Sequence, residues 1–303
     1  MWPALVIVSV EYTVALVVGF SIGFHRSIAF SSYLITSLLV SALAVMGISL
    51  WRIVTRSTRP SSELIEVIAS IVLVGLQMAV LGWLKVMLPH ARPFWADPML
   101  ANLDAAIFRT DPWRITHFLF GWATSIIDRA YVTWALLKFT TLFCVLLAPP
   151  SILKTRAILS YFLMVASAAV GQYALSSAGP VFYERFGFGD RFAALPMEPW
   201  VHITSAYLWE GYQSPAAHMG AGISAMPSLH VAIALWISLV VRAYLPRLQA
   251  LGWLYFALIL IGSVHLGWHY AADSLVAVAI ALAAWSVAIP RQRSEWRPAH
   301  EAA

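Results

Sequence analysis

The feature that most constrains this chain is the recurrence of apolar runs about as long as a bilayer is thick. A helix needs about 20 consecutive apolar residues to cross the hydrocarbon core. We recognise eight candidate spans, the last rather short: residues 3–24, 33–53, 63–88, 130–148, 157–177, 228–245, 250–268 and 272–290. The sequence therefore predicts an all-α fold, a polytopic membrane bundle of about eight transmembrane helices.

Composition agrees with a membrane protein. Hydrophobic residues make up 61% of the 303 residues and charged residues only 11%, whereas soluble domains carry about 25% charged residues. The net charge of +5 could suggest nucleic-acid binding. Most Arg residues instead cluster in short loops between apolar runs, so we expect no nucleic-acid partner. The single cysteine, Cys144, excludes an intramolecular disulfide.

The basic loops also predict the orientation of the bundle, because cytoplasmic loops of membrane proteins are enriched in Lys and Arg. Basic residues follow the second, fourth, sixth and eighth spans: Arg52, Arg56, Arg59, Lys154, Arg156, Arg242, Arg247, Arg291, Arg293 and Arg297. We expect this side and both termini to be cytoplasmic. The first run has neither a basic leader nor an evident cleavage site, so we interpret it as a retained span.

Two long segments fall on the opposite side, which is periplasmic, extracellular or lumenal. Residues 89–129 hold several prolines and aromatic stretches, and we expect them to lie along the membrane interface. Residues 178–226 are rich in Gly, Pro and aromatic side chains. Loops of that length are uncommon unless they are functional or disordered, so we expect a folded loop that covers or shapes a site.

Three polar clusters fall on this same outer side. His269 and Asp273 are four residues apart, the spacing at which two side chains share a helix face. A carboxylate bonded to one imidazole nitrogen leaves the other free to act as a nucleophile. Buried His–Asp pairs also occur as structural contacts, and membrane-depth ionisable groups favour the functional interpretation.

The second cluster begins a helix. In Pro227-Ser228-Leu229-His230 the proline suits the first helical position. The amides that follow it would form an anion site with the Ser228 hydroxyl at a helix N-terminus. Alone, such a tetrapeptide is more often an ordinary helix cap.

The third cluster is Lys85 with Arg92, two cations suited to phosphate oxygens. The plainer alternatives are a lysine that snorkels to the interface and an arginine that is solvated in a loop.

Together the motifs resemble the type 2 phosphatidic acid phosphatase superfamily. The resemblance rests on Lys85 with Arg92-Pro93, on Pro227-Ser228-Leu229-His230, and on His269 with Asp273. Ala-Met-Pro-Ser-Leu-His, His-Tyr-x-x-Asp and Leu-Asp-x-x-Ile-Phe are more similar to the inositol phosphorylceramide synthase and sphingomyelin synthase branch. The resemblance covers about residues 80–290.

The resemblance implies a six-helix phosphatase-like core and a role for each motif. His269 would attack phosphorus to form a phosphohistidine, with Asp273 orienting it. His230 would protonate the leaving oxygen and then activate water or an alcohol. Lys85, Arg92 and the amides at the helix start would bind the phosphoryl oxygens. No metal and no other cofactor is implied.

One position departs from the family pattern. The phosphatases carry Ser-Arg where this chain has Gly262 and Ser263. His265, or an arginine from residues 185–191, could take the place of the missing arginine. His90 could act as a second-shell residue beside the first motif.

Two further sets of polar side chains have alternative interpretations. His265, His269 and His230 could together be read as a zinc site, an interpretation that the neighbouring Lys and Arg charges disfavour. Glu11 and Lys138 lie inside spans and could form a pair or a water-lined contact within the bundle. A transport role is the alternative for these two residues, although nothing else in the sequence supports a relay.

The sequence thus divides into three parts: two N-terminal transmembrane helices in residues 1–60, a catalytic membrane domain in residues 61–290, and a cytoplasmic tail in residues 291–303. The leading hypothesis is an integral-membrane phosphotransferase that moves a phosphoryl or phospho-headgroup unit from a lipid to an alcohol such as inositol or glycerol. A lipid phosphate phosphatase with the same site is the alternative. A non-catalytic lipid transporter is a third. The sequence leaves the oligomeric state open.

Overall fold

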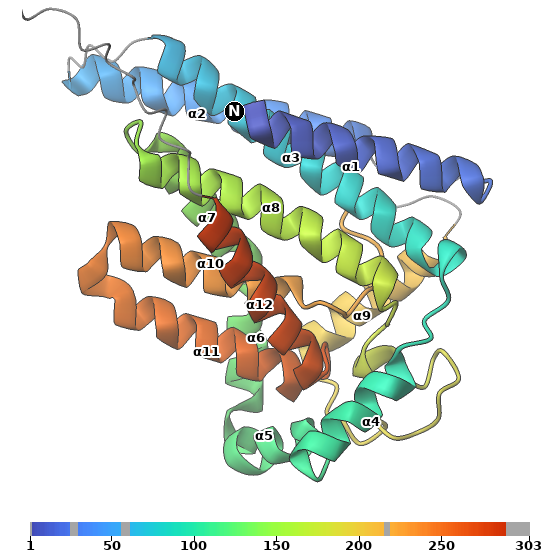
Figure 1. The fold of residues 1–303 in the computed structure, drawn as a ribbon. Helices are drawn as coiled ribbons and strands as arrows, with labels where there is room; N and C mark the ends of the chain where they lie inside the picture. Colours follow the sequence, from blue (N-terminus) through green and yellow to red (C-terminus); the bar gives the residue numbers. More distant parts are fainter. Residues whose placement is uncertain (1, 25–29, 56–60, 215–218, 289–303) are drawn as a thin grey trace, which may run out of the picture.

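The computed structural model describes residues 2–24, 30–55, 61–214 and 219–288, and within these ranges every regular element is a helix (Figure 1). The α-helices are α1 Trp2–Ser21, α2 Phe30–Thr55, α3 Ser61–Ala91, α4 Asp97–Phe108, α5 Pro112–Phe120, α6 Thr124–Val132, α7 Trp134–Leu147, α8 Ile152–Ala174, α9 Pro199–Gln213, α10 Leu229–Tyr244, α11 Gln249–His265 and α12 Ala271–Val287. Three short 3₁₀ helices are η1 Gly121–Ala123, η2 Pro180–Phe182 and η3 Pro246–Leu248.

Six stretches of the described residues are long and apolar enough to cross a membrane: Trp2–Ser21, Ser31–Leu50, Leu64–Ala91, Pro112–Leu147, Ile152–Ala174 and Pro246–His265. Helices α10 and α12 are also apolar but shorter, with 16 and 17 residues. The structure therefore confirms a polytopic helical membrane bundle, while the count of eight spans stays a prediction. The predicted tail, residues 291–303, lies outside the described residues.

Helix α10 lies at the centre of the bundle, where it packs against α7, α8, α11 and α12. Its ten residues 231–240 are all buried, and the indole of Trp236 donates to the Ala157 carbonyl of α8. On α12 the buried face is made of small side chains, including Ala277, Ala281 and Ala284. Small residues let helix backbones approach closely in a membrane, where the hydrophobic effect does not hold helices together.

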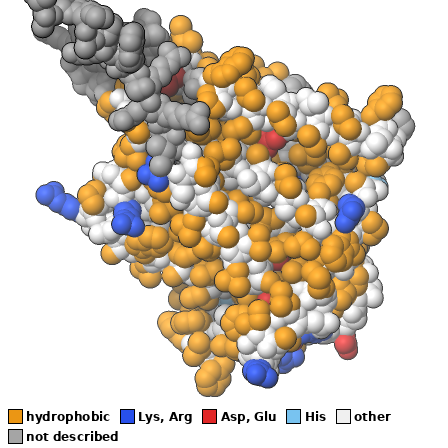
Figure 2. Space-filling model, viewed as in Figure 1, with side chains coloured by type: hydrophobic (Ala, Val, Ile, Leu, Met, Phe, Trp, Pro, Cys, Tyr) orange, Lys and Arg blue, Asp and Glu red, His pale blue; other side chains and the backbone are white. Residues whose placement is uncertain are grey.

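The N-terminal helices α1 and α2 pack on α3 along one edge of the bundle (Figure 1). Glu11 of α1 is buried there and accepts a hydrogen bond from Gln77 of α3 at 3.1 Å. Lys138 lies on α7 and forms no ion pair with Glu11, so the pairing considered from the sequence is not formed. Figure 2 shows that hydrophobic side chains cover most of one face, with Lys and Arg at its edges.

The segment expected at the interface, residues 89–129, is more varied than the prediction. Helix α4 packs beside the start of α12, whereas α5 and α6 pack along α11. From Pro112 onward this part joins α7 in one apolar stretch that reaches Leu147. The span predicted at 130–148 is therefore only the second half of a longer stretch, in which Thr133 separates α6 from α7.

Candidate active site

Three chain segments that are distant in sequence meet at one end of the bundle (Figure 1). They are the C-terminal part of α3, the start of α10, and the turn between α11 and α12. Each carries one of the three sequence motifs. The structure places Lys85, His230 and His269 in the wall of one cavity.

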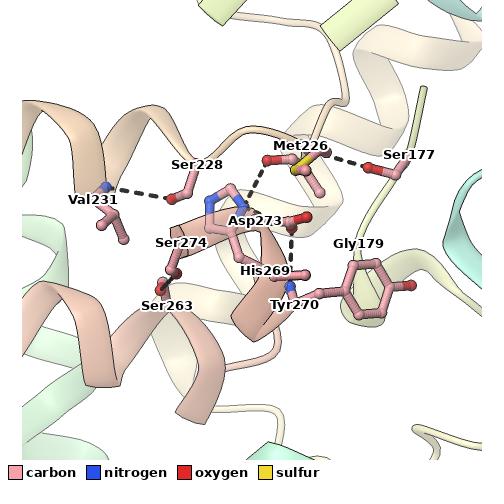
Figure 3. A network of polar contacts seen from close by, with 12 residues as sticks. Ser177, Gly179, Met226, Ser228, Val231, Ser263, His269, Tyr270, Asp273 and Ser274 are labelled. Carbon is pink, nitrogen blue, oxygen red and sulfur yellow. Dashed lines mark hydrogen bonds and ion pairs between the residues drawn. The ribbon is translucent and has the colours of Figure 1, made fainter. Parts of the chain in front are cut away.

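Helix α10 begins at Leu229, two residues after the proline that the sequence places at the first helical position. Ser228 is the N-cap, and its hydroxyl accepts a hydrogen bond from the Val231 N–H at 3.3 Å (Figure 3). Serine is a favoured N-cap, since its oxygen satisfies an amide that has no partner within the helix. Pro227 therefore precedes the cap rather than occupying the first helical position. The Ser228 side chain is fully buried and outside the cavity wall, so its hydroxyl serves the cap.

The imidazole of His269 is oriented chiefly by a backbone group. Its Nδ1 lies 2.9 Å from the carbonyl oxygen of Ala225 and 3.5 Å from Oδ2 of Asp273 (Figure 3). A carbonyl can only accept, so Nδ1 carries the proton and the Nε2 lone pair is free. Because α12 begins at Ala271, His269 reaches Asp273 from the preceding turn rather than from a shared helix face.

Asp273 binds more tightly to the turn itself. Its Oδ2 accepts a hydrogen bond from the Tyr270 N–H at 2.9 Å, and the side chain is fully buried. The carboxylate therefore fixes the backbone that carries His269 while it also contacts the imidazole. The sequence does not predict the contact with the Ala225 carbonyl, because every residue carries a backbone oxygen and no motif marks this one.

His230 faces the free nitrogen of His269. Its Nδ1 lies 3.4 Å from Nε2 of His269, so the two rings are in direct contact and a group bound beside them in the cavity could reach both. The imidazole sits between two aromatic side chains, Tyr131 at 5.0 Å and Trp134 at 4.4 Å between ring centroids. One imidazole is thus placed to attack and the other to exchange a proton.

Two buried aspartates of α4 hold the turn and the loop beside it. Asp104 accepts hydrogen bonds from the first two amides of α12, Ala271 at 2.6 Å and Ala272 at 3.0 Å. Asp97 accepts from the amides of Ala178 and Gly179, each at 2.8 Å. Burial raises the pKa of both Asp97 and Asp104 to about 6, against the hydrogen bonds that lower it.

Asp97 also accepts a hydrogen bond from the Tyr270 hydroxyl at 2.8 Å. Burial, followed by the charge of Asp97, raises the pKa of Tyr270 well above its usual value. The tyrosine therefore stays protonated and donates. Helix α4 therefore fixes the turn after His269 in two ways. Asp97 binds the Tyr270 hydroxyl, and Asp104 binds the two amides that follow Tyr270.

The cavity has a volume of about 690 Å³, within the usual range of ligand pockets. Its wall comes mainly from α2, α3, α7 and α9 and from the loop before α10, and most of it is apolar. Lys85 forms no hydrogen bond or ion pair with any described residue. Gly222 (φ +106°) packs so closely on Lys85 that an added Cβ would lie 2.6 Å from the lysine Cβ.

Neither Arg92 nor an arginine of residues 185–191, which the sequence suggests as phosphate ligands, lies in the wall of this cavity. Arg92 is exposed at the end of α3 and is absent from the wall. Arg191 binds Asp111 and the Ala101 carbonyl, while Arg185 lies over the Trp209 ring at 5.2 Å. The second lysine in the wall is Lys138, which the sequence analysis treated only as a contact within the bundle.

His265 and His90 also lie away from the site. The His265 ring is stacked on His117 at 3.9 Å, and its Nε2 lies 2.9 Å from the Thr124 hydroxyl. It therefore neither replaces the missing arginine nor converges with the other two imidazoles on a zinc position. His90 contacts Phe24 at 5.3 Å between ring centroids.

The fold and the site together define a class, namely membrane proteins whose helical bundle opens an apolar cavity onto two histidines and a lysine. Comparison with protein families identifies the superfamily within that class. The model of the PAP2 superfamily matches residues 100–287, and the chain belongs to this superfamily. The matched range includes His230, His269 and Asp273 and begins after Lys85. No curated protein and no solved structure gave a significant match.

Membership supports a phosphatase-type enzyme of lipid phosphates that is integral to a membrane.

Proposed function

We propose that the protein transfers a phosphoryl or phospho-headgroup unit from a membrane lipid to an acceptor, through a phosphohistidine on His269. The observation that carries the proposal is the hydrogen bond of Nδ1 to the Ala225 carbonyl at 2.9 Å. It leaves the nucleophilic nitrogen, Nε2, directed at His230 beside the cavity.

The first step forms a bond from His269 Nε2 to phosphorus and breaks the bond from phosphorus to the leaving oxygen. His230 gives its proton to that oxygen. Lys85 and the amides at the start of α10 bind the phosphoryl oxygens as their charge redistributes. In the second step the acceptor oxygen attacks phosphorus, His230 takes its proton, and the bond to His269 breaks. Neither step requires a metal ion.

A neutral polar group in the cavity wall suits an acceptor that carries a hydroxyl group, such as inositol or glycerol, and suits water equally. Gln172 of α8 is buried and lines the cavity, and its amide makes no hydrogen bond with any described residue. An amide both donates and accepts, as a hydroxyl group requires. This acceptor chemistry agrees with the motif similarity to the inositol phosphorylceramide synthase branch. Water at the same position would make the protein a lipid phosphate phosphatase.

The test is turnover of a labelled lipid phosphate by purified protein, with a chelator present and candidate alcohols added. Label that enters a new lipid only when an alcohol is present supports transfer. Free labelled phosphate without any alcohol product would leave hydrolysis as the activity. Turnover that survives in both His269→Ala and His230→Ala would reject the proposed site. A complete lack of turnover over a broad lipid panel would leave the lipid transporter.

We further propose that the site faces the periplasmic, extracellular or lumenal side, opposite the basic loop at η3. In a Cys144→Ser background, Asp190→Cys near the site and Arg247→Cys in η3 can be labelled in intact cells with a membrane-impermeant maleimide. Labelling of Asp190→Cys alone supports this orientation. Labelling of Arg247→Cys alone would reverse it.

A further inference from the structure

The imidazole of His230 lacks the kind of partner that orients His269. Nδ1 of His269 lies 2.9 Å from the Ala225 carbonyl and 3.5 Å from the Asp273 carboxylate. Among the described residues, the one hydrogen-bond contact of the His230 side chain is with His269, at 3.4 Å. No described carboxylate or carbonyl therefore orients the His230 ring, although the proposed mechanism uses this ring for proton transfer in both steps.

Two aromatic rings contact the imidazole of His230 instead. Tyr131, near the end of α6, stacks on it with 5.0 Å between ring centroids and 29° between ring planes. Trp134, the first residue of α7, lies at 4.4 Å and 45°. All three side chains line the cavity. Contact with an aromatic ring leaves the imidazole nitrogens open to proton transfer, and it stays favourable when the imidazole is protonated, because a ring face attracts a cation.

The Tyr131 ring is itself fixed by a close contact with α11. Tyr131 is 6% exposed, and a Cβ added at Gly262 would lie 2.9 Å from the ring carbon Cδ2. Any larger residue at position 262 would therefore displace the ring. Gly262 is one of the two positions at which the chain departs from the family pattern, and this packing accounts for the glycine, since Tyr131 occupies the space of a side chain.

The polar groups of the two aromatic residues do not explain their presence. The Tyr131 hydroxyl and the Trp134 indole N–H are both buried without a hydrogen-bond partner among the described residues. Burial of a polar group without a partner lowers stability, and an aliphatic side chain would fill the same space without that cost. The contact that remains for both residues is the one between their rings and His230.

Resting on the proposed function, we propose that Tyr131 and Trp134 are positioning residues, which hold the His230 imidazole in the orientation that gives its proton to the leaving oxygen. Neither residue exchanges a proton itself. Tyr131 has the larger effect, because its ring is closer to parallel with the imidazole and is fixed at Gly262. Without these rings the imidazole rotates about its side-chain bonds, and a misplacement of about 1 Å can cost about 100-fold in rate.

The test uses two probes that share a chain and differ in the leaving group. Dodecyl phosphate releases an alkoxide that must be protonated, whereas a nitrophenyl phosphate carrying the same dodecyl chain releases a stable phenolate. Tyr131→Leu is expected to lose about ten-fold more kcat/KM on the alkyl probe than on the nitrophenyl probe, and Trp134→Leu to show a smaller difference. Tyr131→Phe, which keeps the ring, is expected to recover most of the loss. Equal losses on both probes, or no loss on either, would overturn the proposal.

Two further variants separate this inference from the proposed function. His230→Ala is expected to show the same dependence on the leaving group more strongly, whereas His269→Ala loses turnover of both probes. If His230→Ala shows the dependence and Tyr131→Leu does not, the positioning role alone is rejected. If His230→Ala loses both probes equally, the role of His230 as an acid is rejected, and the positioning role with it.

Gly262→Ala disturbs the same ring from α11 and leaves both aromatic residues in place. Alanine suits a helix interior, but its methyl group would meet the Tyr131 ring, so the same dependence on the leaving group is expected. Gly252→Ala is the matched control on α11, where the new Cβ would lie 3.3 Å from Cα of Ser238. A comparable change in the ratio of the two kcat/KM values in Gly252→Ala would show that any packing defect between α10 and α11 produces the effect, and would reject the assignment.

A chemical arm needs no turnover. Diethyl pyrocarbonate acylates unprotonated imidazole, and peptide mapping at a fixed pH gives the rate at each histidine. Tyr131→Leu is expected to raise the rate at His230 several-fold, with the exposed His202 as the internal reference, and Tyr131→Phe to restore the wild-type rate. An unchanged rate at His230 in Tyr131→Leu would reject the positioning role, whichever lipid the enzyme uses.

Discussion

The carbonyl oxygen of Ala225 lies 2.9 Å from Nδ1 of His269, closer than the carboxylate of Asp273 at 3.5 Å. Ala225 belongs to the segment just before α10, so the motif that carries His230 also sets the tautomer of His269. The two histidines are therefore coupled through the backbone as well as across the cavity. This arrangement makes the proposed nucleophile depend on an acceptor that no side-chain substitution removes.

The first prediction concerns Asp273. Since Ala225 already fixes the imidazole tautomer, Asp273→Asn is expected to lower kcat by roughly 10²–10³-fold, rather than abolish turnover as His269→Ala should. The measurement is single-turnover kinetics on a lipid phosphate, with near-UV circular dichroism to confirm the fold. Equal loss in Asp273→Asn and His269→Ala would show that the carboxylate, and not the carbonyl, orients the imidazole.

The second prediction concerns Asp104, which accepts from two backbone amides of α12. Asp104→Ala leaves both amides without this acceptor, at a cost of about 1–3 kcal/mol for the buried amide of Ala272 and less for the partly buried amide of Ala271. We expect a lower melting temperature together with reduced kcat, and a smaller effect of Asp104→Asn. The exposed Asp190 offers a control, and Asp190→Ala should change neither quantity. Full stability of Asp104→Ala would contradict the assigned role.

The third prediction is a dependence of stability on pH. Burial raises the pKa of Asp97 and Asp104 to about 6 in the folded state, from an ordinary value of 3.8. The folded state therefore binds more protons than the unfolded state between about pH 4 and pH 6, and stability falls as pH rises through this window. Melting temperatures of wild type should show this slope, and Asp97→Asn/Asp104→Asn should flatten it. An unchanged slope in the double variant would show that other titrating groups cause the pH dependence of stability.

The fourth prediction uses a pair of glycines in the loop over Lys85. Gly222 and Gly220 both have positive φ, at +106° and +79°, so an alanine strains the backbone at either position by about 1–3 kcal/mol. Only at Gly222 would the new Cβ meet Lys85; at Gly220 it meets nothing within 4 Å. We expect Gly222→Ala to raise KM for the lipid at least five-fold more than Gly220→Ala. Equal effects would mean that backbone strain in the loop, and not the position of Lys85, changes KM.

The sequence predicts much of this site because its motifs lie at helix ends, and the alternation of spans brings those ends together. Lys85, His230 and His269 were found in this way. The Asp104 to Ala271 contact joins residues 167 positions apart, which lies beyond any local spacing rule. A signal was nevertheless present, since Asp97 and Asp104 are seven residues apart and share a helix face.

Lys138 was identified in the sequence but assigned to the bundle interior, because its neighbours on α7 are apolar and carry no motif. Arg92 is the opposite case: its motif predicts a phosphate contact, which stays a prediction, and the structure leaves its side chain exposed and outside the cavity wall. Helix periodicity places a residue on a helix but does not specify which side of that helix faces a cavity. That information comes only from the packing of α7 beside α3 and α10.

The most direct test of the central claim is to trap the phosphorylated enzyme. Wild type and His269→Ala are mixed with a lipid whose transferred phosphate is radiolabelled, quenched in alkali within milliseconds, and digested for peptide mapping. The account predicts an acid-labile, alkali-stable label on His269 of wild type and none on the variant. Continued turnover by His269→Ala, or a label on another residue, would contradict a phosphohistidine at this position.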